Sequence, residues 1–170
     1  VDGFGAGWDR MHILAIMKDV RLGNYGATAL ILALAARIAL TAAIAVRLDG
    51  VAILAALMAA HAVSRGTVLV PMLALPYARA EDATSRAKPV VQGLDGTARL
   101  TAALGVLAPL ALLPPPVALA GLAAAGATGA AWTRLCARRL GGYTGDVLGA
   151  VQQTGEIAFL LGILAAWKFI

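Results

Sequence analysis

The sequence is poor in cysteine, in aromatic residues and in charge. Its one cysteine, Cys136, excludes an internal disulfide and a multi-cysteine metal site, and a buried, inert thiol is expected. Aromatic residues make up 5% of the chain and charged residues 14%, whereas 61% is hydrophobic. A soluble domain of 170 residues cannot cover that much apolar surface, because small globules leave much of their chain exposed. The composition therefore indicates membrane helices packed through small residues rather than a β-barrel with aromatic girdles.

Five apolar stretches could cross a bilayer, which needs roughly 20 residues of helix per crossing. They run over about 26–46, 51–75, 98–113, 117–132 and 147–167. The third and fourth are short and meet at Pro114-Pro115-Pro116, which predicts a tight turn because proline cannot continue one helix but can open the next. The predicted fold class is all-α: a multi-pass transmembrane helical bundle of about five spans plus an interfacial N-terminal helix, in a single domain over residues 1–170.

The cationic side chains are divided unevenly between the two ends of these spans. If each stretch crosses, ten Lys and Arg lie on one side and two on the other. The ten are Arg10, Lys18, Arg21, Arg79, Arg86, Lys88, Arg99, Arg134, Arg138 and Arg139, and the two are Arg47 and Lys168. Short basic loops stay in the cytoplasm, so the basic face is predicted to be cytoplasmic, in the cell (inner) membrane, with the C-terminus outside. Because the charges mark topology, no nucleic-acid partner is expected despite a net charge of +5.

The first polar motif precedes the first span. It holds Asp2 among several glycines, followed by Lys18, Asp19 and Arg21. Glycines let a backbone approach a ligand closely, and carboxylates are the oxygen ligands that a phosphate-bound Mg²⁺ requires. Asp2 and Asp19 are therefore candidate metal ligands, and Lys18 and Arg21 could hold phosphate oxygens. An interfacial amphipathic helix capped by Asp9 explains the same residues equally well.

The second motif, Gly141-Gly142-Tyr143-Thr144-Gly145-Asp146, leads into the last span. Asp146, Gly149, Gln153 and Glu156 share one face of that helix, because intervals of three and four residues separate them. An ionisable residue more than two turns inside a span is costly and is a functional hypothesis by default. The alternatives are a helix cap for Asp146 and, for Glu156, a buried group that hydrogen-bonds between helices.

The third motif lies in and after the second apolar stretch. It comprises His61, Ser64-Arg65 and Pro76-Tyr77-Ala78-Arg79. Arg65 lies roughly 18 Å of helix from Tyr77, at 1.5 Å per residue, which is deep for a charge. It could reach a phosphate in a polar cavity or pair with Glu156. His61 is expected to be a satisfied interior histidine rather than a metal ligand, and Arg37 to be interfacial or snorkelling.

Together the three motifs resemble the cobalamin synthase family, adenosylcobinamide-GDP ribazoletransferases. The residues that carry the resemblance are Asp2-Gly3, Ile16-Met17-Lys18-Asp19, Arg21, Gly23, Gly26, Ser64-Arg65, Pro76-Tyr77-Ala78-Arg79, Gly142-Tyr143-Thr144-Gly145-Asp146, Gly149 and Glu156. The resemblance implies a Mg²⁺-dependent membrane transferase that joins adenosylcobinamide-GDP to α-ribazole or α-ribazole 5′-phosphate and releases GMP. The family signature usually continues upstream of Asp2-Gly3, so an N-terminal part of the family domain is expected to be missing and independent activity of the chain is in question.

The resemblance and the chemistry of a diphosphate leaving group together assign roles to the motif residues. The predicted catalytic residues are Asp19, Asp146 and Glu156, the metal ligands Asp2, Asp19 and Asp146, and the substrate contacts Lys18, Arg21, Arg65, Arg79 and Gly145. One alternative is a CDP-alcohol phosphotransferase, although its regularly spaced aspartates are absent. Another is a small transporter component, which would place polar residues near the midplane. A homo-oligomer is compatible with the sequence.

Overall fold

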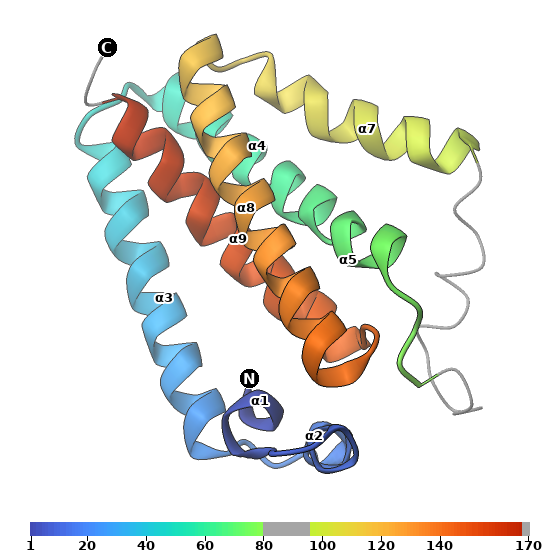
Figure 1. Cartoon of the computed structure of the whole chain (residues 1–170). Coiled ribbons are helices and arrows are strands. Elements are labelled where there is room, and N and C mark those ends of the chain that lie inside the picture. The colour runs from blue at the N-terminus through green and yellow to red at the C-terminus, as the bar shows by residue number, and fades with distance from the viewer. Residues whose placement is uncertain (80–95, 168–170) are drawn as a thin grey trace.

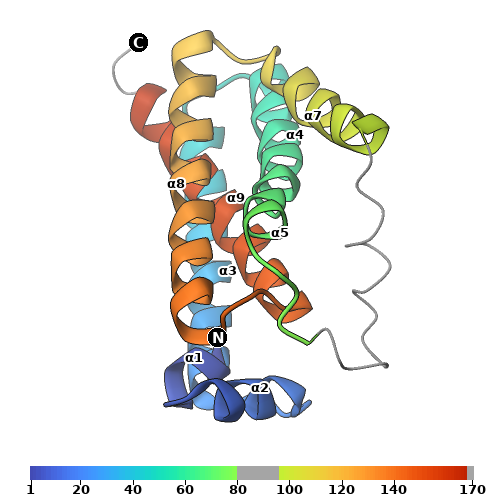
Figure 2. The ribbon, with the colours of Figure 1, turned by 45° about the vertical axis from the view of Figure 1, so that its right-hand side comes forward.

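The computed structural model describes residues 1–79 and 96–167. The helices are α1 (Asp2–Ala6), α2 (Arg10–Lys18), α3 (Asn24–Ala45), α4 (Gly50–Thr67), α5 (Leu69–Ala74), α7 (Gly96–Leu110), α8 (Pro115–Leu140) and α9 (Gly145–Trp167). The helix α9 is central and packs against α8, α4 and α3 (Figure 1). The short helices α1 and α2 cover one end of this bundle, while α7 packs on α4 and leans away from the other helices (Figure 2).

The predicted all-α membrane class is confirmed. Three stretches of the described residues are long and apolar enough to cross a membrane, namely α3, α4 continued by α5, and α9. The helix α7 is shorter, and α8, although 26 residues long, is not among them and contains glycine, threonine and three arginines. Length and composition therefore support three of the five predicted spans. The predicted proline turn is also present, because α7 ends at Leu110 and Pro115 opens α8.

The expectation of a loop that begins before Arg134 is wrong. The helix α8 continues to Leu140 and ends at Gly141, whose φ of 65° is the left-handed conformation that glycine adopts without strain. Arg134 and Arg138, expected in a loop, therefore lie on the last turns of a helix. The hydropathy of the sequence drops after Trp132 because the last turns of α8 carry arginines, yet these turns remain helical.

The second predicted span is interrupted by a proline. The helix α4 ends at Thr67, and α5 begins at Leu69. Pro71 explains the break, because it has no N–H and its ring clashes with the carbonyl of the residue four positions before it, which is Thr67. The chain resumes as α5 and leads to the third motif.

Small residues allow the long helices to approach closely. On α8, Gly121, Ala125 and Gly129 lie four residues apart on one face, and all three are buried. On α9, a Cβ added at Gly162 would lie 2.7 Å from the backbone oxygen of Ala120. Contact between helices through small residues is therefore confirmed, as the composition predicts.

The Gly162→Ala change tests this close approach. We expect it to destabilise the bundle by about 1–3 kcal/mol, because a methyl group placed against backbone forces the helices apart. Thermal unfolding in detergent, followed by circular dichroism, measures the loss. The matched control is Gly126→Ala on α8, where an added Cβ meets nothing within 4 Å. Equal melting temperatures for the two variants would contradict the packing argument.

Candidate functional site

Parts of the three polar motifs meet at the end of the bundle that α1 and α2 cover, whereas His61, Ser64 and Arg65 of the third motif lie within α4. The third and second motifs pair through two backbone hydrogen bonds: the Ala78 N–H donates to the Tyr143 oxygen at 2.8 Å, and the Tyr143 N–H donates to the Pro76 oxygen at 3.0 Å. The rings of Tyr77 and Tyr143 meet edge to face, with centroids 5.5 Å apart. A Cβ on Gly142 would lie 2.5 Å from the Pro76 oxygen, so this pairing requires glycine.

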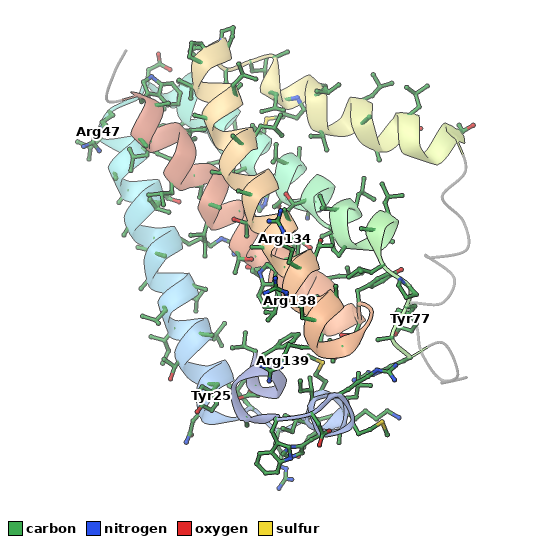
Figure 3. All side chains as sticks on the ribbon, in the orientation of Figure 1. Tyr25, Arg47, Tyr77, Arg134, Arg138 and Arg139 are labelled. Carbon is green, nitrogen blue, oxygen red and sulfur yellow. The ribbon has the colours of Figure 1, made fainter. Side chains whose placement is uncertain are left out.

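The cationic residues mark the same end. In Figure 3, Tyr77, Arg138 and Arg139 lie toward the end where α1 and α2 pack, and Arg47 lies at the opposite end. Arg139 reaches the N-terminal segment directly, since its Nη2 donates to the Gly7 oxygen at 2.7 Å. Residues from the two ends of the sequence therefore form one polar surface.

Arg79 and Asp146 face each other at this junction. Arg79 Nη2 lies 3.8 Å from Asp146 Oδ2, and the Arg79 side chain is 17% exposed whereas the Asp146 side chain is 57% exposed. Arg79 Nη2 also donates to the Leu14 oxygen at 3.4 Å. Its buried Nε has no hydrogen-bond partner among the described residues. This Nε is closed to a ligand in the described structure, so a phosphate oxygen would have to meet the terminal nitrogens of Arg79, which form charge-assisted hydrogen bonds beside the accessible Asp146 carboxylate.

The interpretation of Asp146 as a helix cap is wrong. The helix α9 begins at Gly145, and the residue before it, Thr144, accepts the Val147 N–H on its Oγ1 at 3.3 Å. Thr144 is therefore the cap. Asp146 lies in the first turn, where the helix dipole stabilises a negative charge, but its carboxylate is not needed to close the helix.

Asp2 closes the start of α3. Its Oδ2 accepts the Gly23 N–H at 3.0 Å, and its Oδ1 accepts the Gly26 N–H at 2.8 Å. Both oxygens thus bind backbone groups that the first turn of a helix leaves without partners. Sequence reasoning missed this contact, although the two glycines that make room for the carboxylate were its signal. A metal-binding role for Asp2 stays a prediction.

Asp19 pairs with Arg21. Arg21 Nη2 lies 2.7 Å from Asp19 Oδ2, and Arg21 Nε donates to both carboxylate oxygens at 3.0 Å. The side-chain hydrogen bonds from Arg21, joined by its backbone N–H, lower the pKa of Asp19 to about 2. Asp19 is therefore ionised at neutral pH, and its charge is already matched by Arg21. Lys18 lies beside this pair, in the last turn of α2.

The described residues do not form a magnesium centre made from three protein carboxylates. Among the residues that the structure describes, no three His, Cys, Asp or Glu side chains lie close enough to hold a metal ion. Asp2 is engaged by amides and Asp19 by Arg21. The Asp146 side chain is 57% exposed, so its carboxylate is open to a ligand. Mg²⁺ commonly binds one or two carboxylates together with substrate phosphates and water. The residues therefore fit a magnesium ion carried by a diphosphate better than an all-protein site.

Glu156 lies apart from this junction, buried in the middle of α9 with 5% of its surface exposed. Arg37 of α3 pairs with it, and Arg37 Nε donates to Glu156 Oε1 at 3.1 Å. Arg37 Nη1 also donates to Gln153 Oε1 at 3.0 Å, and His61 Nδ1 lies 3.5 Å from Glu156 Oε2. The predicted shared face of Gln153 and Glu156 is therefore used to bind α3.

The predicted pairing of Arg65 with Glu156 is wrong. Arg65 is exposed on α4, and its Nη1 donates to the His61 oxygen of its own helix at 3.1 Å. Arg37, expected at the interface, occupies the place next to Glu156 instead. Helical spacing indicates which face of a helix is polar, but it does not identify the neighbouring helix.

Comparison with known proteins identifies a family. The family model for cobalamin-5-phosphate synthase matches residues 1–164. A protein from Azorhizobium caulinodans named adenosylcobinamide-GDP ribazoletransferase is 42% identical over 172 residues, which cover 96% of the chain and 62% of the relative. Relatives of the same name from Mesorhizobium japonicum and Ralstonia nicotianae are 44% and 41% identical, covering 94% and 98% of the chain and 59% and 62% of their own lengths. The chain thus spans about three fifths of these relatives. No solved structure matches it.

Exchanging the charges of Arg37 and Glu156 tests their contact. We expect Arg37→Glu and Glu156→Arg each to destabilise the bundle by about 3–5 kcal/mol, because a buried charge loses its partner and meets a like charge. The double variant should recover at least half of the lost thermal stability in detergent, since it restores opposite charges. A double variant no more stable than either single variant would show that the pair does not hold α3 to α9.

Proposed function

Because the chain belongs to the cobalamin-5-phosphate synthase family, we propose that it takes part in joining adenosylcobinamide-GDP to α-ribazole or α-ribazole 5′-phosphate, with release of GMP. The observation that carries this proposal is the junction of Arg79 and Asp146, where an exposed carboxylate and a guanidinium lie 3.8 Å apart. It lies at one end of an apolar helical bundle, where water-soluble substrates could reach it.

The proposed reaction exchanges one bond to phosphorus for another. A ribazole hydroxyl oxygen attacks the phosphorus next to cobinamide, the bond from that phosphorus to the GMP oxygen breaks, and the hydroxyl gives up its proton. Arg79 donates to the phosphate oxygens on which negative charge develops, and Asp146 accepts the proton or orients the attacking hydroxyl. Mg²⁺, held by the diphosphate and Asp146, would supply further neutralisation of the leaving group.

Some of the other predicted site residues lie near this junction, and others lie farther away in the bundle. Lys18 lies in the last turn of α2, and Arg21, which pairs with Asp19, lies in the loop that follows. Both could bind the guanosine phosphates. Gly145 opens α9 beside Asp146 and leaves its backbone accessible. A catalytic role for Asp19 or Glu156 requires a rearrangement of their ion pairs, and Arg65 requires a substrate that reaches α4.

We further propose that the end holding the junction faces the cytoplasm of the cell membrane. The phosphorylated substrates cannot cross a bilayer unaided, and the described Lys and Arg gather mostly at this end. Arg47, which lies at the opposite end, donates to the Ala43 oxygen of its own helix.

The Asp146→Asn change tests the function. We expect GMP release from adenosylcobinamide-GDP and α-ribazole to fall at least about a hundredfold, with partial recovery at higher Mg²⁺, because the change removes an essential charge. The assay uses the detergent-solubilised chain with the two substrates. Because the chain spans about three fifths of its relatives, the same change is also made at the matching position of a full-length relative, where an asparagine variant as active as the wild type would contradict the proposed role of Asp146.

The control for this assay is Asp49→Asn, at the other end of the bundle. Asp49 Oδ1 accepts the Ala52 N–H at 2.8 Å and caps α4, and asparagine caps a helix as well as aspartate does. This variant loses the same charge and should change the rate by less than about threefold. If both variants lose activity equally, the effect does not belong to the junction.

Labelling of two exposed valines that flank α3 tests the orientation. Val20 is 100% exposed before the helix, and Val46 is 87% exposed at its end. In a Cys136→Ala background, Val46→Cys should react with an impermeant maleimide in intact cells, whereas Val20→Cys should react only after the membrane is opened. The reverse pattern would place the junction outside the cytoplasm.

A further inference from the structure

Arg10, the first residue of α2, bridges two segments that are distant in the sequence. Its Nε donates to the Leu140 oxygen at 2.8 Å, and its Nη2 donates to the Ala78 oxygen at 3.2 Å. Leu140 ends α8, so its carbonyl is one that the helix leaves without an internal partner. The Ala78 carbonyl belongs to the peptide that leads into Arg79. One guanidinium thus fixes both the end of α8 and the backbone just before the proposed phosphate contact.

Two further arginines, which lie outside the N-terminal helices, donate hydrogen bonds to backbone carbonyls of the N-terminal segment. Arg139 donates to the Gly7 oxygen at 2.7 Å, and Arg79 donates to the Leu14 oxygen at 3.4 Å. Hydrogen bonds from arginine to backbone carbonyls therefore run from the N-terminal helices to the other motifs and back again. We call Arg10, Arg79 and Arg139 the arginine clasp.

The clasp closes over a small apolar cluster. Ile13 of α2 is completely buried against residues of α8 and α9, among them Cys136 and Val147. Ile13, Leu14 and Met17 are the apolar residues by which α2 packs into this cluster, and the arginine hydrogen bonds at the rim add directional contacts to them. A lysine at position 10 could not replace these contacts fully, because a single ammonium lacks the planar fork that donates to two carbonyls in fixed directions.

We propose that Arg10 is a positioning residue for Arg79 and Asp146. It forms no hydrogen bond or ion pair with either side chain in the described structure and acts through the Ala78 carbonyl. Without this bond the peptide before Arg79 can rotate, whereas Asp146 stays in place because Thr144 caps α9. The distance between the two charged groups then varies. The role of Arg79 and Asp146 in the reaction rests on the proposed function, whereas the hydrogen bonds of the clasp do not depend on it.

The single cysteine of the chain reports on the clasp without any activity assay. Cys136 is 0% exposed beneath α2. In the full chain in detergent, Arg10→Gln should raise the rate of Cys136 labelling by N-ethylmaleimide at least about tenfold, because local opening exposes the thiol. The labelling rate of Arg10→Lys should lie between those of the wild type and Arg10→Gln. Arg47→Gln is the matched control, since Arg47 bonds a carbonyl of its own helix, and it should label like the wild type. Unchanged labelling in Arg10→Gln would overturn the clasp.

Kinetics separate positioning from folding. Per folded molecule, counted by size-exclusion chromatography, Arg10→Gln should lower the kcat of GMP release at least about tenfold and change KM by less than about twofold, because Arg10 does not bind the substrate. Arg10→Lys should recover part of kcat. Faster labelling with unchanged kcat would overturn the positioning role. An Asp146→Asn variant as active as the wild type would instead contradict the proposed role of Asp146, and the labelling result would still decide whether the clasp exists.

Discussion

The structure depends on satisfying the backbone groups that its helices leave open at one end of the bundle. Asp2 closes the start of α3, Thr144 closes the start of α9, and Arg10 binds the carbonyl at the end of α8. A buried amide or carbonyl without a partner costs as much as a lost hydrogen bond, so these contacts fix where each helix begins and ends. Several polar residues of the motifs are therefore needed to hold the fold. Only polar groups that the fold does not use are available to bind a ligand.

The ionisable residues fall into two classes according to their access to solvent. In the middle of the bundle, Arg37 binds Glu156 Oε1 and Gln153, whereas the buried Glu156 Oε2 lies 3.5 Å from His61 Nδ1 and has no hydrogen-bond partner among the described residues. At the end of the bundle, Arg79 and Asp146 are 3.8 Å apart, and the Asp146 side chain is 57% exposed whereas that of Glu156 is 6% exposed. The buried cluster joins helices out of reach of solvent, whereas the carboxylate of the pair at the end can meet a ligand from solution. This difference, rather than charge alone, separates the proposed site from the rest.

The sequence predicted what depends on local pattern. Apolar length and small residues identified the helical membrane class, the prolines located the turn before α8, and helical spacing placed Gln153 and Glu156 on one face. It could not predict the extension of α8 to Leu140, because hydropathy detects the apolar layer and not the helix. It also could not identify Arg37 as the partner of Glu156, since that depends on which helix packs against α9.

The glycines of the second motif show how structural needs and ligand needs can be separated. Gly141 has a left-handed backbone, and Gly142 leaves space for the Pro76 carbonyl, so both are explained by the fold. Gly145 is not explained in this way, because its φ is not positive and an added Cβ would meet nothing within 4 Å. A side chain there would instead cover the backbone at the start of α9, next to Asp146. The absence of a packing reason supports the prediction that Gly145 leaves room for the substrate.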